Sequence, residues 1–299
     1  MPNKTNIPVF ILAGGMGTRI SEETSLRPKP MIEIGEIPIL LHLMRWYYSF
    51  GFTEFVICAG YRSWEIKEYF LTYEFRRNHL RIDHREATNF LPMTLGKNSE
   101  QENWRVDIID TGVESMTGAR LARALDELSR YHSFSNFALT YGDGLSDINL
   151  EEELKFHLSH GRIGTVLGVP PAARWGELDI SSDMEVEGFL EKPEARAGLI
   201  NGGFFFFRRE FRDFLSAQAD CVLERAPLTQ LSAARQLMVY KHTGFWHPMD
   251  TLRDKYHLQS IWDSGKAPWK SDTTFGSTSP VQKEGADGIA PTSETVGHA

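Results

Sequence analysis

Short apolar runs alternate with longer amphipathic stretches along this chain, and this alternation restricts the fold more than any other feature of the sequence. The strand-like runs occupy residues 9–13, 54–59, 104–110, 136–141, 164–169, 177–180, 202–207 and 237–242. Stretches with apolar residues at helical spacing occupy residues 38–51, 63–75 and 118–131. The early strand-like runs are almost continuously apolar, as in strands that are buried on both faces of a sheet. The sequence therefore predicts an α/β fold with a mostly parallel central sheet and helices on both of its faces.

The length, charge and cysteine content limit the organisation and the ligands of the chain. Its 299 residues, 41% of them hydrophobic, suffice for one large domain, and no apolar run reaches the roughly 20 residues of a membrane helix. Cys58 and Cys221 are the two cysteines, and no Cys/His spacing is typical of a metal site, so we expect a reducing, cytoplasmic environment. The net charge of −8 argues against a general nucleic-acid binder but is compatible with a small phosphorylated ligand.

Two segments match no regular element. Residues 271–299 are rich in Ser, Thr, Gly and Pro and hold a single aromatic residue, so we expect a disordered C-terminal tail after one domain over residues 1–270. Residues 86–103 lack a clear period. We interpret them as an extended loop or hairpin and as a candidate for a lid or a subunit contact.

A glycine-rich segment, residues 14–19, directly follows the first strand-like run. Its spacing differs from that of a Walker A loop, and it also differs from the dinucleotide fingerprint, because the second strand ends only near residue 59. For the glycines alone, a tight turn without any ligand remains an alternative. Thr18, Arg19 and Lys29 favour a ligand, because free backbone N–H groups together with cations are suited to a polyphosphate.

Two aspartates are candidates for a metal site. Asp143 stands between two glycines after the run 136–141, and ligands of parallel α/β sheets bind at the carboxyl ends of strands. Asp250 stands among aromatic and apolar residues, where a carboxylate is normally paired or bound to a metal such as Mg²⁺. The alternatives are an ordinary Asp-Gly turn for Asp143 and a helix N-cap for Asp250. The sequence alone does not show that the two carboxylates meet.

Two segments further along are candidates for contacts with a sugar phosphate. Lys192 could reach a phosphate and Glu191 could accept from sugar hydroxyls, although a charged surface turn explains both equally well. Asn201 begins a turn with two glycines, where a ligand could approach, and the four phenylalanines that follow are expected in the core. We assign no catalytic histidine, because His42 lies on the apolar face of its predicted helix.

Six segments, in order, resemble the motifs of the sugar-1-phosphate nucleotidyltransferases. They are ILAGGMGTR with RPKPM, DTG with SMTGARL, TYGDG, FLEKP, INGGFF and GFWHPMDTLRDKYHL, and they extend over about residues 8–270. Each motif alone is modest evidence, whereas their shared order makes the resemblance specific. Within the family, the match is to the branch that uses CTP and α-D-glucose 1-phosphate. The resemblance implies a single Rossmann-like domain, distinct from that of dehydrogenases and without the left-handed β-helix of some relatives.

The resemblance also implies a role for each matching residue. The nucleotide-binding positions would be Leu12, Ala13, Gly14, Gly15, Met16, Gly17, Thr18, Arg19, Lys29, Thr111, Met116, Gly118, Arg120 and Gly142. Thr111 takes the position at which the family reads the base. Mg²⁺ would be bound by Asp143 and Asp250, and the sugar phosphate would be bound by Glu191, Lys192 and Asn201. The catalytic residues would be Arg19, Lys29 and Asp143.

The activity that the resemblance implies is direct in-line displacement at the α-phosphorus of CTP. An oxygen of glucose 1-phosphate would attack, pyrophosphate would leave, and the CDP-glucose would feed deoxysugar synthesis for the O-antigen of bacterial lipopolysaccharide. The family also implies a homo-oligomer. Two alternatives stay open: a nucleotidyltransferase that uses UTP, dTTP or another sugar 1-phosphate, and a non-catalytic regulatory protein that binds sugar nucleotides. The joint presence of Lys29, Asp143 and Asp250 speaks against the regulatory protein.

Overall fold

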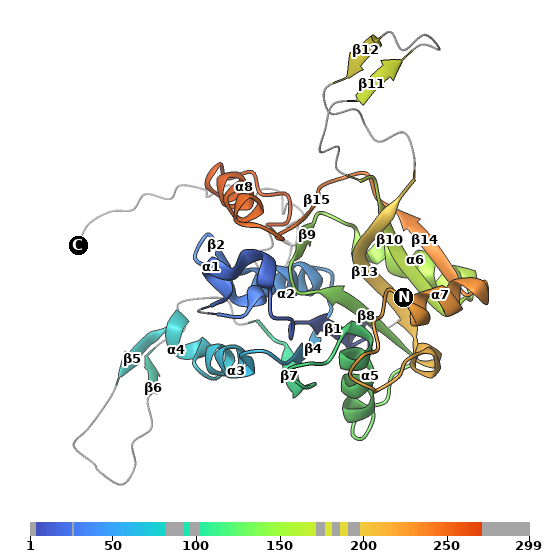
Figure 1. The fold of residues 1–299 in the computed structure, drawn as a ribbon. Helices are drawn as coiled ribbons and strands as arrows, with labels where there is room; N and C mark the ends of the chain where they lie inside the picture. Colours follow the sequence, from blue (N-terminus) through green and yellow to red (C-terminus); the bar gives the residue numbers. More distant parts are fainter. Residues whose placement is uncertain are drawn as a thin grey trace, which may run out of the picture.

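A seven-stranded sheet forms the centre of the computed structural model, which describes residues 4–25, 27–81, 93–95, 102–171, 177–180, 186–190 and 198–270. In spatial order, its strands are β14 (Leu237–Lys241), β10 (Gly164–Val169), β13 (Ile200–Arg208), β8 (Asn136–Tyr141), β1 (Val9–Leu12), β4 (Glu54–Ala59) and β7 (Arg105–Asp110). Neighbouring strands are parallel except at β13, which runs antiparallel to both β10 and β8. The mostly parallel sheet predicted from the sequence is therefore confirmed (Figure 1).

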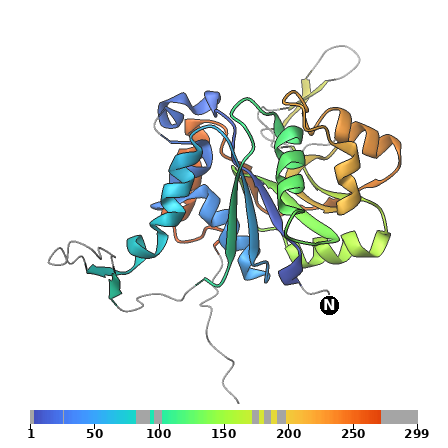
Figure 2. The same cartoon turned by 90° about the horizontal axis from the view of Figure 1, so that it is seen from below.

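Helices cover both faces of this sheet, as Figure 2 shows from below. Because successive side chains of a strand point to opposite faces, Val9 and Ile11 of β1 join one core cluster and Phe10 and Leu12 join the other. The first cluster includes residues of α2 (Ile39–Ser49), α3 (Ser63–Leu71), α6 (Leu150–His160) and α8 (Leu252–Asp263). The second cluster includes residues of α5 (Thr117–Leu128) and α7 (Ala226–Ala233).

The four phenylalanines of β13 follow the same alternation. Phe204 and Phe206 belong to the first cluster, Phe205 and Phe207 belong to the second, and none is more than 1% exposed. The expectation that these four side chains lie in the core is confirmed. They fix the register of β13 between β8 and β10, and thereby fix where Asn201 emerges at the other end of the strand.

Short elements complete the described chain. The two-stranded sheets are β2 (Glu33–Ile34) with β3 (Ile37–Pro38), β5 (His79–Arg81) with β6 (Met93–Leu95), β9 (Gly144–Ser146) with β15 (Trp246–Pro248), and β11 (Glu177–Ile180) with β12 (Val186–Leu190). The short helices are η1 (Lys4–Asn6), η2 (Thr18–Ile20), α1 (Ser21–Thr24), η3 (Lys29–Met31), α4 (Tyr73–Arg77) and η4 (Arg209–Phe214). No helix among the described residues is long and apolar enough to cross a membrane.

Several elements differ from those predicted. The helix expected over 63–75 is divided at Thr72 into α3 and α4, and the strand over 177–180 pairs with β12 rather than joining the central sheet. Both α6 and α7 went unpredicted. Within 86–103, β6 pairs with β5 as one strand of a hairpin, while residues 86–92 and 96–101 lie outside the described residues, as does the predicted tail 271–299.

Candidate active site

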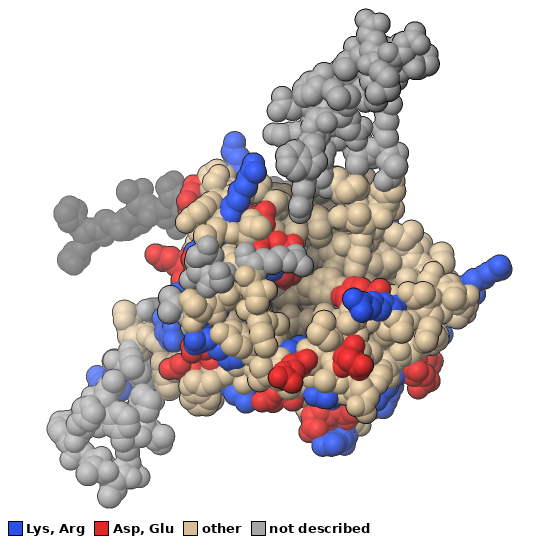
Figure 3. All heavy atoms as spheres, in the orientation of Figure 1, with Lys and Arg blue, Asp and Glu red and all other residues tan. Residues whose placement is uncertain are grey.

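A cavity of about 550 Å³ lies at the carboxyl ends of β1 and β8. Ligands of parallel α/β sheets bind at this edge. Figure 3 shows the hollow near the middle of this face. The cavity is lined by Leu12, Ala13, Gly14, Gly15, Gly17, Thr18, Lys29, Pro30, Ser115, Met116, Thr117, Arg120, Tyr141, Gly142, Asp143, Asn201, Trp246, Pro248 and Asp250. Most of the candidate site residues read from the sequence therefore line one cavity.

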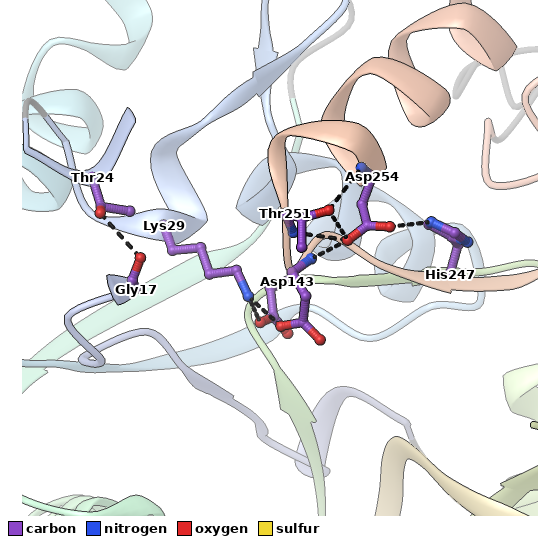
Figure 4. Close-up of polar contacts among 8 residues, drawn as sticks. Gly17, Thr24, Lys29, Asp143, His247, Thr251 and Asp254 are labelled. Atoms are coloured by element: carbon purple, nitrogen blue, oxygen red, sulfur yellow. Dashed lines mark hydrogen bonds and ion pairs between the residues drawn. The ribbon is translucent and has the colours of Figure 1, made fainter. Parts of the chain in front are cut away.

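Lys29 joins the two predicted metal ligands inside this cavity. Its Nζ donates to Asp143 Oδ2 at 2.5 Å and to Asp250 Oδ1 at 2.9 Å (Figure 4). The lysine side chain is 13% exposed, and this burial alone would lower its pKa. The charges and hydrogen bonds of Asp143 and Asp250 outweigh the burial, and the pKa of Lys29 is raised. Lys29 is consequently a cation at neutral pH.

The backbone brings the two aspartates together although they are far apart in the sequence. Asp143 follows β8 directly, and Gly142 before it donates its N–H to Leu12 O at 3.0 Å, so the turn lies against the end of β1. A side chain at Gly142 would bring a Cβ within 2.7 Å of that same oxygen. On the other side, β9 pairs with β15, and the Met249 N–H donates to Asp143 O at 2.8 Å. These bonds place Asp250 beside Asp143.

The N-cap alternative for Asp250 is wrong. The N-cap of α8 is Thr251, whose Oγ1 accepts from the Asp254 N–H, while Asp254 Oδ2 accepts from the Thr251 N–H at 2.7 Å. This reciprocal pair is a capping box. Asp254 Oδ2 also accepts from the Asp250 N–H at 3.1 Å, so the cap holds the backbone of Asp250 and leaves its side chain directed at Lys29.

The glycine-rich segment curves around the mouth of the cavity. The Tyr61 N–H donates to Gly14 O at 3.0 Å, and Thr24 Oγ1 donates to Gly17 O at 3.1 Å (Figure 4). Gly17 has φ of +62°, a conformation that favours glycine. Met16 is exposed and does not line the cavity. The side chain of Arg19 lies outside the described residues, although its backbone belongs to η2.

Arg120 supports the floor of the cavity. It is 4% exposed, and its guanidinium donates to Thr111 Oγ1 at 3.0 Å, to Gly112 O at 2.7 Å and to Val113 O at 2.9 Å. A Cβ at Gly14 would come within 2.1 Å of this guanidinium, so the absence of a side chain there admits the arginine. Thr111 is fully buried and does not line the cavity. Gly118 is likewise buried, with its backbone against Cys221.

The predicted sugar-phosphate residues are described only in part. Asn201 lines the cavity, and its Nδ2 donates to the Tyr141 hydroxyl at 3.2 Å. Glu191 and Lys192 lie outside the described residues. The sequence reading missed Tyr141, Thr117 and Trp246 as lining residues. All three lie within the motifs SMTGARL, TYGDG and GFWHPMDTLRDKYHL, and could have been found from them.

Comparison with known proteins decides the family. The model of the nucleotidyl transferase family matches residues 8–251. The chain belongs to the nucleotidyl transferase family. The resemblance predicted from the sequence motifs is thereby confirmed.

Two relatives of this nucleotidyl transferase align with it over nearly their whole length. It is 40% identical to the glucose-1-phosphate cytidylyltransferase of Salmonella typhi over 270 residues, which is 87% of this chain and 98% of the relative. It is 38% identical to the probable glucose-1-phosphate cytidylyltransferase of Bacillus subtilis over 260 residues, with coverage of 87% and 98%.

Solved structures support the fold alone, because their identities to this nucleotidyl transferase are low. HddC from Yersinia pseudotuberculosis has a TM-score of 0.56 at 21% identity and covers 86% of this chain and 99% of its own. A putative glucose-1-phosphate thymidylyltransferase from Bacillus anthracis, in complex with a sucrose, has a TM-score of 0.60 at 14% identity, covering 91% and 98%. The predicted Rossmann-like nucleotidyltransferase fold is confirmed.

Proposed function

We propose that this nucleotidyl transferase transfers the cytidylyl group of CTP to α-D-glucose 1-phosphate, giving CDP-glucose and pyrophosphate. The observation that carries the proposal is the 40% identity, along nearly the whole length of both chains, to a glucose-1-phosphate cytidylyltransferase. The cavity agrees with it, because Lys29, Asp143 and Asp250 meet where a triphosphate and a sugar phosphate would be brought together.

The pair Asp143 and Asp250 fits a divalent metal of the Mg²⁺ type. Both offer carboxylate oxygens, which hard cations prefer, and both already direct an oxygen at one cation, the Lys29 ammonium. No group of three or more His, Cys, Asp or Glu side chains among the described residues could hold a metal. This suits Mg²⁺, which usually takes one or two carboxylates and completes its shell with water and substrate phosphates. When bound, the metal would neutralise charge on the reacting phosphates.

The residues of the chain have to bind and align two anions. An oxygen of the sugar phosphate forms the new bond to the α-phosphorus, the bond from that phosphorus to the bridging oxygen breaks, and the electrons leave with pyrophosphate. The sugar phosphate is ionised at neutral pH, so no side-chain nucleophile is required. Backbone N–H groups of residues 14–18 and Arg19 would hold the leaving phosphates, and Lys29 would neutralise the reacting ones. Glu191, Lys192 and Asn201 would hold the sugar phosphate.

A wider setting follows from the product. We expect CDP-glucose to enter deoxysugar synthesis for the O-antigen of lipopolysaccharide in the cytoplasm, and the enzyme to work as a homo-oligomer.

The two cysteines fit a reducing environment. Cys58 and Cys221 are both free thiols, and burial raises the pKa of Cys58 to about 12, so this thiol is inert at neutral pH.

The test is a pyrophosphate-release assay with each of CTP, UTP, dTTP and GTP against a panel of sugar 1-phosphates. The expected result is release with Mg²⁺ that is fastest for CTP with glucose 1-phosphate. Faster release with UTP, dTTP or another sugar would reassign the substrate within the family. Binding without release for every pair would identify a regulatory protein instead.

A further inference from the structure

Glu224 lies just outside the cavity and links two of its walls. Its Oε1 accepts from the Tyr141 hydroxyl at 2.5 Å, and its Oε2 accepts from Thr117 Oγ1 at 2.8 Å. Tyr141 ends β8 and Thr117 begins α5, and both line the cavity. A single carboxylate therefore joins the wall formed by α5 to the wall formed by β8.

The segment that carries Glu224 is bound tightly to α5. The Met116 N–H donates to Ala219 O at 2.8 Å, and the Gly118 N–H donates to Cys221 O at 2.9 Å. The Leu223 N–H donates to Thr117 Oγ1 at 2.9 Å. A Cβ at Gly118 would come within 2.7 Å of Cys221 Sγ, so the contact admits no larger residue. Glu224 is thus placed by its backbone, although its side chain is exposed.

The Tyr141 hydroxyl bonds to both Glu224 and Asn201, and so connects these two side chains. The Tyr141 hydroxyl directs its proton at Glu224, since it donates to Oε1. The hydroxyl oxygen then accepts from Asn201 Nδ2 at 3.2 Å, while Asn201 Oδ1 accepts from the Gly203 N–H at 2.8 Å. These two bonds fix the orientation of the amide, and its second N–H hydrogen stays available to a ligand.

The tyrosine ring cannot move aside. Gly203 has φ of +78°, and a Cβ there would come within 2.4 Å of the Tyr141 ring, so the ring lies directly on the backbone of β13. Packing thus sets the place of the ring, and Glu224 and Asn201 decide the direction in which the hydroxyl hydrogen points.

We propose that Glu224 is a positioning residue that orients the Tyr141 hydroxyl and, through it, the Asn201 amide toward the sugar phosphate. This inference rests on the proposed function. Glu224 touches neither substrate in this arrangement and acts through the Tyr141 hydroxyl. The effect belongs to the sugar-phosphate half of the cavity, because Thr117 on the nucleotide side keeps its bond to Leu223 when Glu224 is changed.

The test removes the acceptor oxygens of residue 224 and measures each substrate separately. Glutamine would keep one acceptor oxygen, which could still serve Tyr141, so the deciding variant is Glu224→Ala: it removes both acceptors, and neither the Tyr141 nor the Thr117 hydroxyl can donate to residue 224. The KM for glucose 1-phosphate should rise by about tenfold, the equivalent of one hydrogen bond to a charged group, while the KM for CTP changes by less than about threefold. The matched control is Asp220→Asn, which changes an exposed carboxylate of the same segment.

A double-variant cycle with Tyr141→Phe separates a positioning role from a general structural one. If Glu224 acts through the hydroxyl, the double variant should have the KM of the worse single variant, because the second change removes nothing further. Additive effects, an equal rise in both KM values, or an unchanged KM for glucose 1-phosphate would each overturn the proposal. If the wild-type chain releases no pyrophosphate with this pair, the proposed function fails. In that case the free energies of unfolding in urea are compared for the wild type, the two single variants and the double variant. If the effects of the two substitutions on stability simply add, Glu224 and Tyr141 are not coupled and the contact between them is contradicted.

Discussion

Lys29 places its ammonium between two carboxylates that a divalent cation would also need. Its Nζ lies 2.5 Å from Asp143 and 2.9 Å from Asp250, so a metal bound by this pair would compete with the lysine for the same oxygens. Lys29→Gln removes the internal cation, and we expect it to bind Mn²⁺ about tenfold more tightly in the absence of substrate. Isothermal titration calorimetry measures this affinity. Lys155→Gln, an exposed lysine paired with Glu151 and Glu152, is the control. An unchanged Mn²⁺ affinity in Lys29→Gln would contradict the competition.

Asp143 carries the proposed metal role most directly. Asp143→Asn keeps the shape of the turn and removes one negative charge from the pair, and turnover should fall by on the order of 10²-fold or more, as when one preorganised electrostatic contact is lost. The pyrophosphate-release rate at saturating substrates measures this. Asp126→Asn, which changes an exposed carboxylate on α5 paired with Arg212, should keep the wild-type rate. Turnover near wild type in Asp143→Asn would remove the metal assignment.

Among the elements, α6 directs one acid into the core. Both carboxylate oxygens of Glu153 are buried without a hydrogen-bond partner in the described structure, and burial raises the pKa of Glu153 to about 8. The folded chain then holds a proton that the unfolded chain releases above its ordinary pKa of 4.5. Because the native state binds more protons, the free energy of unfolding should fall as pH rises from about 5 to 8, by an amount reaching about 3 kcal/mol at pH 7.

The side chain of the variant Glu153→Gln is neutral at every pH. The variant should therefore lack the fall in the free energy of unfolding between pH 5 and 8 that Glu153 causes. Urea unfolding of both proteins at several pH values from 5 to 8 measures it. The stability of Glu153→Gln should exceed that of wild type most at pH 8, and the two should converge toward pH 5. Glu152→Gln, an exposed neighbour on the same helix that pairs with Lys155, should keep the wild-type slope. A parallel pH dependence of Glu153→Gln and wild type would mean that Glu153 is not protonated in the fold.

The same helix shows what the sequence could and could not predict. The strands of the sheet were predictable because most of them contain a continuous apolar run, whereas α6 has three acids in its first turn and a mixed face. Its ends were nonetheless marked, by Asn149, whose side chain accepts from the Glu151 and Glu152 N–H groups, and by Gly161 with φ of +68°. Apolar periodicity alone therefore does not predict α6, although the cap residues mark both of its ends.

The individual residues of the candidate site were predictable from the sequence, but their proximity in space was not. Motifs supplied Lys29, Asp143 and Asp250, but their meeting depends on the pairing of β9 with β15 and on the bond from Met249 to Asp143. These contacts join distant parts of the chain, and no local pattern encodes them. Glu224 belongs to no motif, and only the position of its segment on α5 gives it a role.

At the scale of the whole molecule, the reversed strand β13 connects the two halves of the cavity. β1 and β8 end at the cavity, whereas β13 begins there, so Asn201 at its start faces Tyr141 at the end of β8. A parallel strand in this place would have put its carboxyl end at the cavity. The side that we propose for the sugar phosphate is thus built from the first residues of a strand whose remaining length is anchored by Phe204 to Phe207 in the core.

We expect the folded domain to end just after Trp269. This side chain is 2% exposed and packs against His42 and Phe245, which lie on α2 and just before β15. A chain ending at Lys270 should keep the melting temperature and turnover of the full chain, because residues 271–299 are poor in apolar side chains. A chain ending at Lys266 loses Ala267 and Trp269 from the core, and we expect a loss of about 3 kcal/mol or more, measured by urea unfolding. Equal stability of the two truncated chains would show that Trp269 adds nothing to the core, and a destabilised chain ending at Lys270 would assign the last residues to the fold.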